Sequence, residues 1–299
     1  MMSAQEAFVA YEDVRHRLPP STRPQRTYQE IATLDDIAAD FDVFLLDAFG
    51  VLNIGETAIP GVAERIEQFR AAGKHVLVVS NAASVQRSEL CAKYGRLGFD
   101  FPEADIITSR TTMAAFMDDT KASRWGAMQG TDARMDDFPG LKLAPLENDL
   151  SVYRESDGFL LIGSATWTEE RQSMLEYELQ AFPRRVLVAN PDIVAPREHG
   201  FSKEPGYFAH RLADKTGIKP EFFGKPFGNI YDLTFARLGP VDKSRVLMVG
   251  DSLHTDILGA LNAGVASALV SGFGFFAGED IATAVRVSGI VPDFVAVRP

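Results

Sequence analysis

The sequence contains a single cysteine, Cys91, among its 299 residues. One cysteine excludes a disulfide within the chain, and such sparing use is typical of proteins from a reducing compartment. Basic residues are also few. Thirty Lys and Arg stand against 41 Asp and Glu, which gives a formal net charge of −11. Because an acidic surface repels the phosphate backbone, we expect no nucleic-acid partner.

Long apolar runs are missing as well. No segment reaches the roughly 18 consecutive apolar residues that a transmembrane helix requires. Residues 1–20 carry scattered charges, unlike a secretory signal. We therefore expect a cytoplasmic protein with no membrane partner. The chain has 46% hydrophobic and 24% charged residues, a globular composition, and its length predicts about two domains.

Short apolar runs alternate with stretches of helical periodicity. Residues 43–46 and 76–79 are continuous apolar runs, typical of strands buried on both faces. Residues 62–72 and 84–97 have helical spacing and end at glycines. The alternation returns near the C-terminus, with strands expected at 222–223, 245–250, 268–270 and 294–297 and helices at 229–238 and 255–263. It predicts parallel βαβ units.

The middle of the chain differs, with strands expected at 125–128, 158–162 and 185–189 around a helix at 168–181. We predict an α/β fold in which a Rossmann-like parallel-sheet core carries an inserted α/β domain. The core takes residues 30–119 and 208–299, and the insertion takes residues 120–207. Residues 1–29 form an N-terminal extension, which we interpret as a short helix and an extended arm packed on the surface.

Reactive side chains stand where the expected strands end, the place where open parallel sheets bind ligands. They are Asp47, Ser80 with Asn81, Lys225 and Asp251, followed by Asp256. Clustered carboxylates repel one another unless a cation lies between them, and Mg²⁺ prefers oxygen ligands. A carboxylate can also attack phosphorus, while an amine, a hydroxyl and backbone amides can hold phosphoryl oxygens.

These segments resemble the four motifs of the haloacid dehalogenase (HAD) superfamily. The first is Asp47-Ala-Phe-Gly-Val-Leu52, the second Ser80, the third Lys225 in Gly-Lys-Pro, and the fourth Gly250-Asp-Ser-Leu-His-Thr-Asp256. The insertion lies between the second and third motifs, where class II members carry a C2 cap. Its Ala189-Asn-Pro-Asp192 resembles class IIA, the branch of 4-nitrophenyl-phosphatase-like and sugar- or nucleotide-phosphate phosphatases. The resemblance spans residues 40–299.

The resemblance implies a role for each matching residue. Asp47 is the expected nucleophile, and Asp47, the carbonyl of Phe49, Asp251 and Asp256 are the expected surroundings of Mg²⁺, with Asp256 orienting Lys225 or a bound water. Ser80, the amide of Asn81 and Lys225 are expected to hold the phosphoryl group. Asn190 and Asp192 are expected to contact the substrate from the cap. The implied activity is Mg²⁺-dependent hydrolysis of a small phosphorylated metabolite through an aspartyl-phosphate.

One position departs from the family pattern. Phosphatases of the family carry a second Asp two residues after the nucleophile, where this chain has Phe49. Phenylalanine can neither protonate a leaving group nor activate water. The rate of hydrolysis is therefore expected to be reduced more for alkyl phosphates than for acyl phosphates. Asp192 or a metal-bound water is a candidate substitute.

The departure at Phe49 leaves three alternatives open beside the hydrolase. They are a phosphotransferase, a binding or regulatory protein on an impaired HAD scaffold, and, with less support, a metal-independent dehalogenase. Retention of Asp251 and Asp256 counts against the last. The resemblance is compatible with a homodimer formed through the caps, and the sequence does not specify the substrate.

Overall fold

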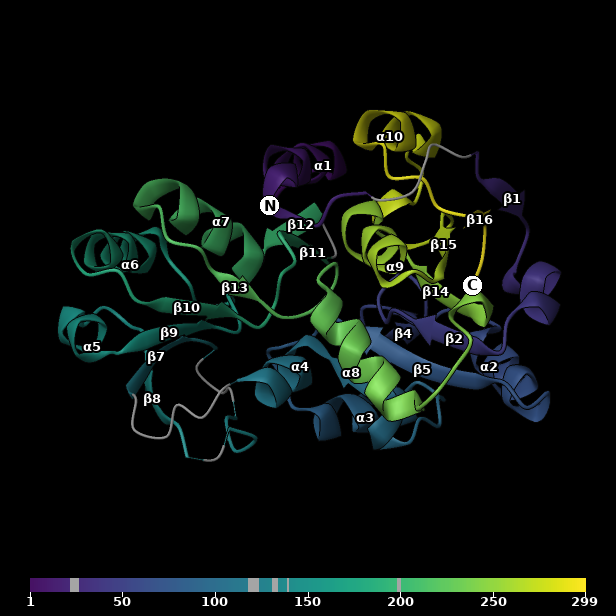
Figure 1. Cartoon of the computed structure of the whole chain (residues 1–299), viewed down its shortest axis with the longest axis horizontal. Coiled ribbons are helices and arrows are strands. Elements are labelled where there is room, and N and C mark those ends of the chain that lie inside the picture. Colours follow the sequence, from purple (N-terminus) through teal and green to yellow (C-terminus); the bar gives the residue numbers. More distant parts are fainter. Residues whose placement is uncertain (22–26, 118–123, 131–133, 139, 198–199) are drawn as a thin grey trace.

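The computed structural model describes the chain except for residues 22–26, 118–123, 131–133, 139 and 198–199. Two parallel sheets form two lobes (Figure 1). The larger sheet has the order β1-β16-β15-β14-β2-β5-β6 and the smaller the order β13-β10-β9-β7-β8. The predicted fold class, a parallel α/β core with an inserted α/β domain, is confirmed.

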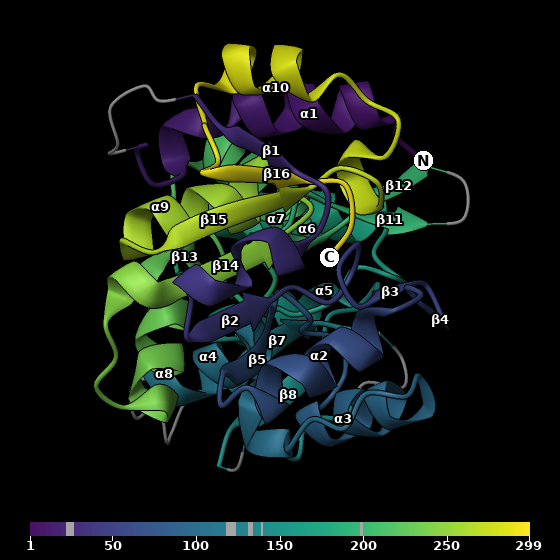
Figure 2. The same ribbon diagram turned by 90° about the vertical axis from the view of Figure 1, so that its right-hand side faces the viewer.

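The main sheet is built from apolar strands that are buried on both faces. Its strands are β1 (Gln29–Ile31), β2 (Val43–Leu46), β5 (His75–Ser80), β6 (Ile106–Thr108), β14 (Val246–Gly250), β15 (Ala266–Val270) and β16 (Phe294–Ala296). Strands β1, β16, β15, β14, β2 and β5 follow one another from top to bottom in Figure 2. All four residues of β2 are at most 2% exposed, as expected of a central strand between two helical layers.

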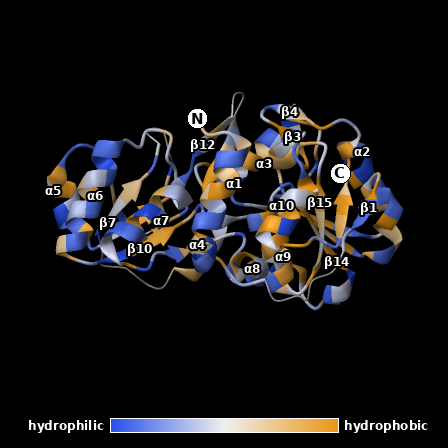
Figure 3. Cartoon of the chain, turned by 90° about the horizontal axis from the view of Figure 1, so that it is seen from above, coloured by the Kyte–Doolittle hydropathy of each residue, from blue (hydrophilic) through white to orange (hydrophobic). Residues whose placement is uncertain are grey.

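Helices cover both faces of this sheet. They are α2 (Val62–Ala71), α3 (Arg87–Arg96), α4 (Ser109–Phe116), α8 (Gly228–Leu238), α9 (Leu258–Ala263) and α10 (Ile281–Ser288). Helix α2 buries Val62, Ile66 and Phe69 against one face, whereas Ile230 and Tyr231 of α8 pack with the opposite face. Hydrophobic residues accordingly concentrate on the strands in Figure 3.

The second lobe is the predicted insertion. Its sheet consists of β7 (Arg124–Met128), β8 (Lys142–Pro145), β9 (Gly158–Leu161), β10 (Arg185–Val188) and β13 (Glu221–Phe222), with helices α5 (Leu150–Glu155), α6 (Glu169–Ala181) and α7 (Pro205–Thr216). We predicted β7, β9, β10 and α6 from sequence, and the structure confirms them. Among the described residues there are also two antiparallel strand pairs, β3 (Asn53–Ile54) with β4 (Thr57–Ala58), and β11 (Val194–Arg197) with β12 (Gly200–Lys203).

Strand β13 corrects one expectation. We expected the strand before Lys225 to belong to the core sheet, but Phe222 pairs with Val188 at the edge of the smaller sheet. A strand of two residues has no sequence pattern that predicts which sheet it joins, because its pairing is set by tertiary contacts. Because α7 and β13 both lie with the second sheet, we propose that the inserted domain extends to about residue 222 rather than 207.

The N-terminal extension contains helix α1 (Ala4–Asp13), which begins after a capping box at Ser3. The Glu6 amide donates to the Ser3 hydroxyl, and the Ser3 amide donates to the Glu6 carboxylate. The expected short helix is present, and it buries Ala7 and Tyr11. In Figure 3 it lies between the two lobes. None of the helices within the described residues is both long and apolar enough to cross a membrane.

Candidate active site

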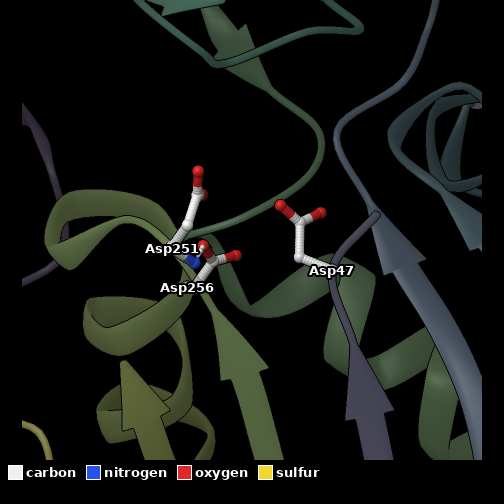
Figure 4. Close-up of side chains that lie close together, drawn as sticks. All are labelled: Asp47, Asp251 and Asp256. Carbon is white, nitrogen blue, oxygen red and sulfur yellow. Dashed lines mark hydrogen bonds between the residues drawn. The ribbon is translucent and has the colours of Figure 1, made fainter. Parts of the chain in front are cut away.

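Three aspartates meet at the carboxyl end of the main sheet. Asp47 follows β2, and Asp251 follows the neighbouring strand β14; the Asp47 amide donates to the Val249 carbonyl at 2.9 Å. Asp256 comes from the turn of helix at Leu253–Ile257. One carboxylate oxygen of each aspartate lies within 4.8 Å of the others (Figure 4). Adjacent parallel strands thus bring together the residues that we predicted to share a site.

Lys225 lies against this cluster. Its ammonium nitrogen is 2.7 Å from Oδ1 of Asp47 and 2.6 Å from Oδ1 of Asp256, and the side chain is almost fully buried. Burial on its own lowers the pKa of Lys225, but the adjacent carboxylates of Asp256 and Asp47 outweigh it and raise the pKa above its ordinary value. Lys225 therefore stays charged and neutralises one of the three carboxylates.

Asp256 has a supporting position beneath the site. Its Oδ2 accepts hydrogen bonds from the backbone amides of Asp251 and Ser252, both at 3.1 Å, while its Oδ1 pairs with Lys225. With both oxygens engaged and the residue 0% exposed, Asp256 is suited to fix Lys225 and the turn after β14. Direct contact with a substrate is the less suitable role.

Asp251 is enclosed by two glycine loops. Its Oδ2 accepts a hydrogen bond from the Phe275 amide at 2.8 Å. A Cβ atom at Gly50 would lie 2.7 Å from this oxygen, and one at Gly274 only 2.0 Å away. Both glycines also have a φ near +75°, which side chains disfavour. Burial, with the charges of Asp256 and Asp47 in addition, raises the pKa of Asp251 well above its usual range.

The strand on the other side of β2 contributes Ser80 and Asn81. Ser80 ends β5, and its hydroxyl accepts from the Ala82 amide at 3.3 Å. The Asn81 side chain fastens the Lys225 segment: its Oδ1 accepts from the Lys225 amide, and its Nδ2 donates to the Lys225 carbonyl, both at 2.8 Å. From sequence we had considered only the backbone amide of Asn81, and missed this clamp.

The inserted domain supplies Asn190 and Asp192. Asp192 Oδ1 accepts from Asn81 Nδ2 at 2.7 Å, so the loop after β10 is tied directly to the loop after β5. Asn190 Oδ1 accepts from the Asp192 amide at 3.0 Å, and its Nδ2 donates to the Glu204 carboxylate at 3.5 Å. Burial raises the pKa of Asp192 to about 7, although the bond from Asn81 and the charge of Lys225 oppose the shift.

These side chains surround a cavity of about 490 Å³, a volume in the range of small-molecule sites. Of the nine residues predicted from sequence, eight line it: Asp47, Phe49, Ser80, Asn81, Asn190, Asp192, Lys225 and Asp251. The ninth, Asp256, lies beneath. The cavity therefore combines a carboxylate nucleophile candidate, a fixed ammonium and a hydroxyl at the boundary between the two lobes.

Comparison with known proteins identifies the family. The profile of the haloacid dehalogenase-like hydrolases matches residues 44–138, and a second HAD-hydrolase-like profile matches residues 222–297. Together they contain every motif residue of the core domain described above. The chain belongs to the haloacid dehalogenase-like hydrolases. It is of the class IIA type, to which sugar phosphatases and 4-nitrophenylphosphatases belong.

Individual relatives agree with this assignment. The chain is 29% identical over 226 residues to an acid sugar phosphatase of Staphylococcus haemolyticus, covering 74% of this chain and 82% of that protein. Its fold matches that of a possible sugar phosphatase of Cytophaga hutchinsonii, with a TM-score of 0.79, 24% identity, and coverage of 90% and 98%. It also matches a glycerol phosphate phosphatase of Mycobacterium tuberculosis crystallised with magnesium, with a TM-score of 0.69, 25% identity, and coverage of 87% and 76%.

The donor set of this HAD hydrolase fits a magnesium ion. Three carboxylates converge, and Lys225 neutralises the charge of only one. Asp251 has a backbone amide as its partner, and burial, together with the charges of Asp256 and Asp47, raises its pKa. A hard divalent cation with oxygen ligands would relieve this repulsion. Asp47 and Asp251 are the two carboxylates that both line the cavity and belong to the acidic cluster.

Tyr11 and Phe275 are among the residues that line the HAD site and were not predicted from sequence. Tyr11 reaches the cavity from α1, and Phe275 from the loop after β15. Phe275 lies in the glycine-rich stretch 272–276, which carries none of the four motifs, and Tyr11 belongs to an extension outside the resemblance. Neither position has a local signal, because each joins the site through packing between segments far apart in sequence. His254, inside the fourth motif, is turned toward α1 and contacts Glu12.

Proposed function

We propose that the protein is a Mg²⁺-dependent phosphatase of a small phosphorylated metabolite, acting through an aspartyl-phosphate on Asp47. The observation that carries the proposal is the ammonium of Lys225 shared between Asp47 and Asp256 at 2.7 and 2.6 Å, at the base of the cavity. The sugar phosphatase and glycerol phosphate phosphatase relatives support this substrate class. The test is release of inorganic phosphate from a panel of sugar, glycerol, nucleotide, aryl and acyl phosphates.

The reaction has two displacements at phosphorus. An oxygen of Asp47 attacks, the bond from phosphorus to the ester oxygen breaks, and the leaving group departs with the electron pair and takes up a proton. Water then attacks the phosphorus of the aspartyl-phosphate, which releases inorganic phosphate, restores the Asp47 carboxylate and frees a proton. Lys225, the Ser80 hydroxyl and the amide of Asn81 hold the phosphoryl oxygens and stabilise the charge that gathers on them.

Asp47, Asp251 and the carbonyl of Phe49 would hold Mg²⁺. When bound, the ion supplies positive charge that offsets the repulsion between carboxylate and phosphate. Asp256 keeps Lys225 in place from below through its ion pair. Asn81 does the same from the side through its two bonds to the Lys225 backbone.

Removal of the metal is expected to abolish turnover. EDTA should eliminate phosphate release and added Mg²⁺ should restore it. Mg²⁺ at about 100 times its dissociation constant should raise the free energy of unfolding by about 2.7 kcal/mol, because it binds the folded state. Thermal unfolding with and without Mg²⁺ measures the second effect. Asp251→Asn should weaken it, whereas Asp232→Asn, on the exposed surface of α8, should not. Equal turnover in EDTA would contradict the proposed ion.

We assign the missing acid to Asp192. Phe49 lines the cavity but carries no proton. Asp192 also lines it, from the inserted domain, and one of its oxygens is fixed by Asn81. Among the described residues no hydrogen bond reaches the other oxygen, Oδ2. A carboxyl group with a pKa of about 7 is matched to proton transfer at neutral pH.

Asp192→Asn is therefore expected to lower kcat by about 10²-fold for glycerol 3-phosphate and less for 4-nitrophenyl phosphate, whose leaving group needs no proton. The acid acts while protonated. Since burial raises its pKa to about 7, kcat of the natural protein should fall as the pH rises through 7. The variant should lack this descending limb. Steady-state kinetics from pH 5 to 9 measure both effects. If kcat of Asp192→Asn falls with rising pH as it does in the natural protein, another group is the acid.

Phe49 favours a second candidate, a phosphotransferase that retains the aspartyl-phosphate until another acceptor arrives. The two candidates differ after the first displacement. A phosphatase releases phosphate as fast as the leaving group. A phosphotransferase releases one equivalent of leaving group in a burst and phosphate only slowly, until an acceptor other than water is added.

A further inference from the structure

Helix α1 joins the two lobes beside the catalytic cavity. At its start, Met2 and Phe201 of β12 exchange two backbone hydrogen bonds of 2.9 Å each, which ties the helix to the inserted domain. Near its end, Glu12 lies 2.5 Å from the imidazole of His254 in the core. The helix lies between the lobes in Figures 1 and 3.

Tyr11 is the residue of α1 that reaches the cavity. Its ring stacks on His254 with centroids 4.9 Å apart and meets Phe275 edge-on at 6.4 Å. Its hydroxyl oxygen accepts a hydrogen bond from the Ile193 amide at 3.2 Å. Tyr11 is 3% exposed and Ile193 is 1% exposed, so this bond is shielded from water. The ring thus rests on the core while the hydroxyl holds the inserted domain.

The apolar surroundings of Tyr11 show the same bridging. One continuous buried cluster contains residues of α1, of the β11–β12 region and of the core, namely Ala7, Tyr11, Ile193, Val194, Phe201, Leu253, Ile257 and Phe275. Because these side chains pack closely together, they hold the inserted domain against the core at this side of the cavity.

We propose that α1 is a permanent wall of the active site and that Tyr11 is a positioning residue, which holds the loop of residues 190–193 through the Ile193 amide and so keeps Asp192 in the cavity. The effect on turnover rests on the proposed function. Ile193 is the neighbour of Asp192 in the chain, and Asn81 holds the Asp192 side chain from the core. The loop is therefore fixed at two points, one of which the N-terminal extension supplies.

The physical expectation is specific to the hydroxyl. Tyr11→Phe keeps the ring and its stacking but leaves the buried Ile193 amide without its acceptor, a costly state that favours local opening of the loop. Tyr11→Ala removes the ring as well and leaves a void in the wall. A shifted loop misplaces Asp192, and proton transfer depends steeply on such placement.

The experiment compares the full chain with Tyr11→Phe, Tyr11→Ala and Tyr207→Phe. Tyr207 of α7 is the control, because its hydroxyl accepts a hydrogen bond from the Lys203 ammonium of β12 and the residue does not line the catalytic cavity. Amide hydrogen exchange at Ile193 is measured by NMR, and kcat and KM are measured for glycerol 3-phosphate and 4-nitrophenyl phosphate. Tyr11→Phe should speed exchange at Ile193 by about tenfold or more. It should lower kcat for glycerol 3-phosphate by about tenfold relative to 4-nitrophenyl phosphate, with little change in KM.

Both changes in Tyr11→Phe, and neither in Tyr207→Phe, support the proposal. Faster exchange without a change in the ratio of the two kcat values overturns the positioning role, and so does a changed ratio without faster exchange. If the natural protein hydrolyses neither ester, the proposed function fails, and the exchange at Ile193 alone decides whether Tyr11 holds the loop. Tyr11→Phe preserves the packing, so the test does not depend on the folding of Tyr11→Ala.

Discussion

Asp47→Asn is expected to reduce phosphate release by roughly 10⁴–10⁶-fold, the loss typical when a covalent nucleophile is removed. The amide of asparagine is a poor nucleophile, and no other described carboxylate that lines the cavity is paired with Lys225. Asparagine keeps the shape of the side chain, and its carbonyl oxygen can still accept from Lys225. A discontinuous phosphate assay with the best substrate of the panel measures the loss.

The stability of this variant provides an internal control. Asp47 and Asp256 share the ammonium of Lys225, and Asp251 lies in the same acidic cluster, so removing the charge of Asp47 relieves repulsion within the cluster. In EDTA at neutral pH, the melting temperature of Asp47→Asn should therefore be no lower than that of the natural protein. Asp232→Asn, at an exposed position, should equal the natural protein in both melting temperature and turnover. An Asp47→Asn protein that melts normally yet retains more than about one tenth of the turnover would exclude the covalent mechanism.

The parts of the site that could be predicted from sequence are those with local signals. An apolar strand followed by Asp47, or by Gly250 and Asp251, is recognisable in a few residues, and parallel strands place their ends at one edge. The alternation of apolar and amphipathic segments likewise predicted five strands of the main sheet, β2, β5, β14, β15 and β16, and three strands of the inserted sheet, β7, β9 and β10, but it missed β1, β6 and β8. For Asp47, Ser80 and Asp251 this order of strands is sufficient to explain why they meet.

The parts that could not be predicted depend on contacts between distant segments. Strand β13 has two residues, and only its pairing with β10 decides which sheet it joins. The Asn81 side chain contacts Asp192 and Lys225, which lie 111 and 144 positions away. Tyr11 contacts Ile193 across 182 positions, from an extension that carries no motif. Such contacts are set by three-dimensional packing, which no short sequence pattern encodes.

Phe49→Asp is expected to raise kcat for glycerol 3-phosphate by about 10²-fold or more, if proton transfer limits turnover in the natural protein. The position lines the cavity next to the nucleophile loop, and aspartate adds a proton donor there. The gain for 4-nitrophenyl phosphate should be much smaller. Phe49→Asn is the matched control, because asparagine has the size and shape of aspartate and is polar, but it has no acidic proton. An equal gain in both variants would mean that the ring only obstructs the cavity.

Combining Phe49→Asp with Asp192→Asn decides where the proton comes from. If Asp192 is the donor in the natural protein, Asp192→Asn is damaging beside Phe49 but nearly harmless beside an aspartate at position 49, since the new acid replaces it. The two substitutions are then strongly non-additive in the activation free energy. If the proton comes from elsewhere, the effects add. The new aspartate also affects the metal site, because a further carboxylate beside Asp47 and Asp251 increases the repulsion among them. The turnover of Phe49→Asp should therefore depend more steeply on the Mg²⁺ concentration than that of the natural protein.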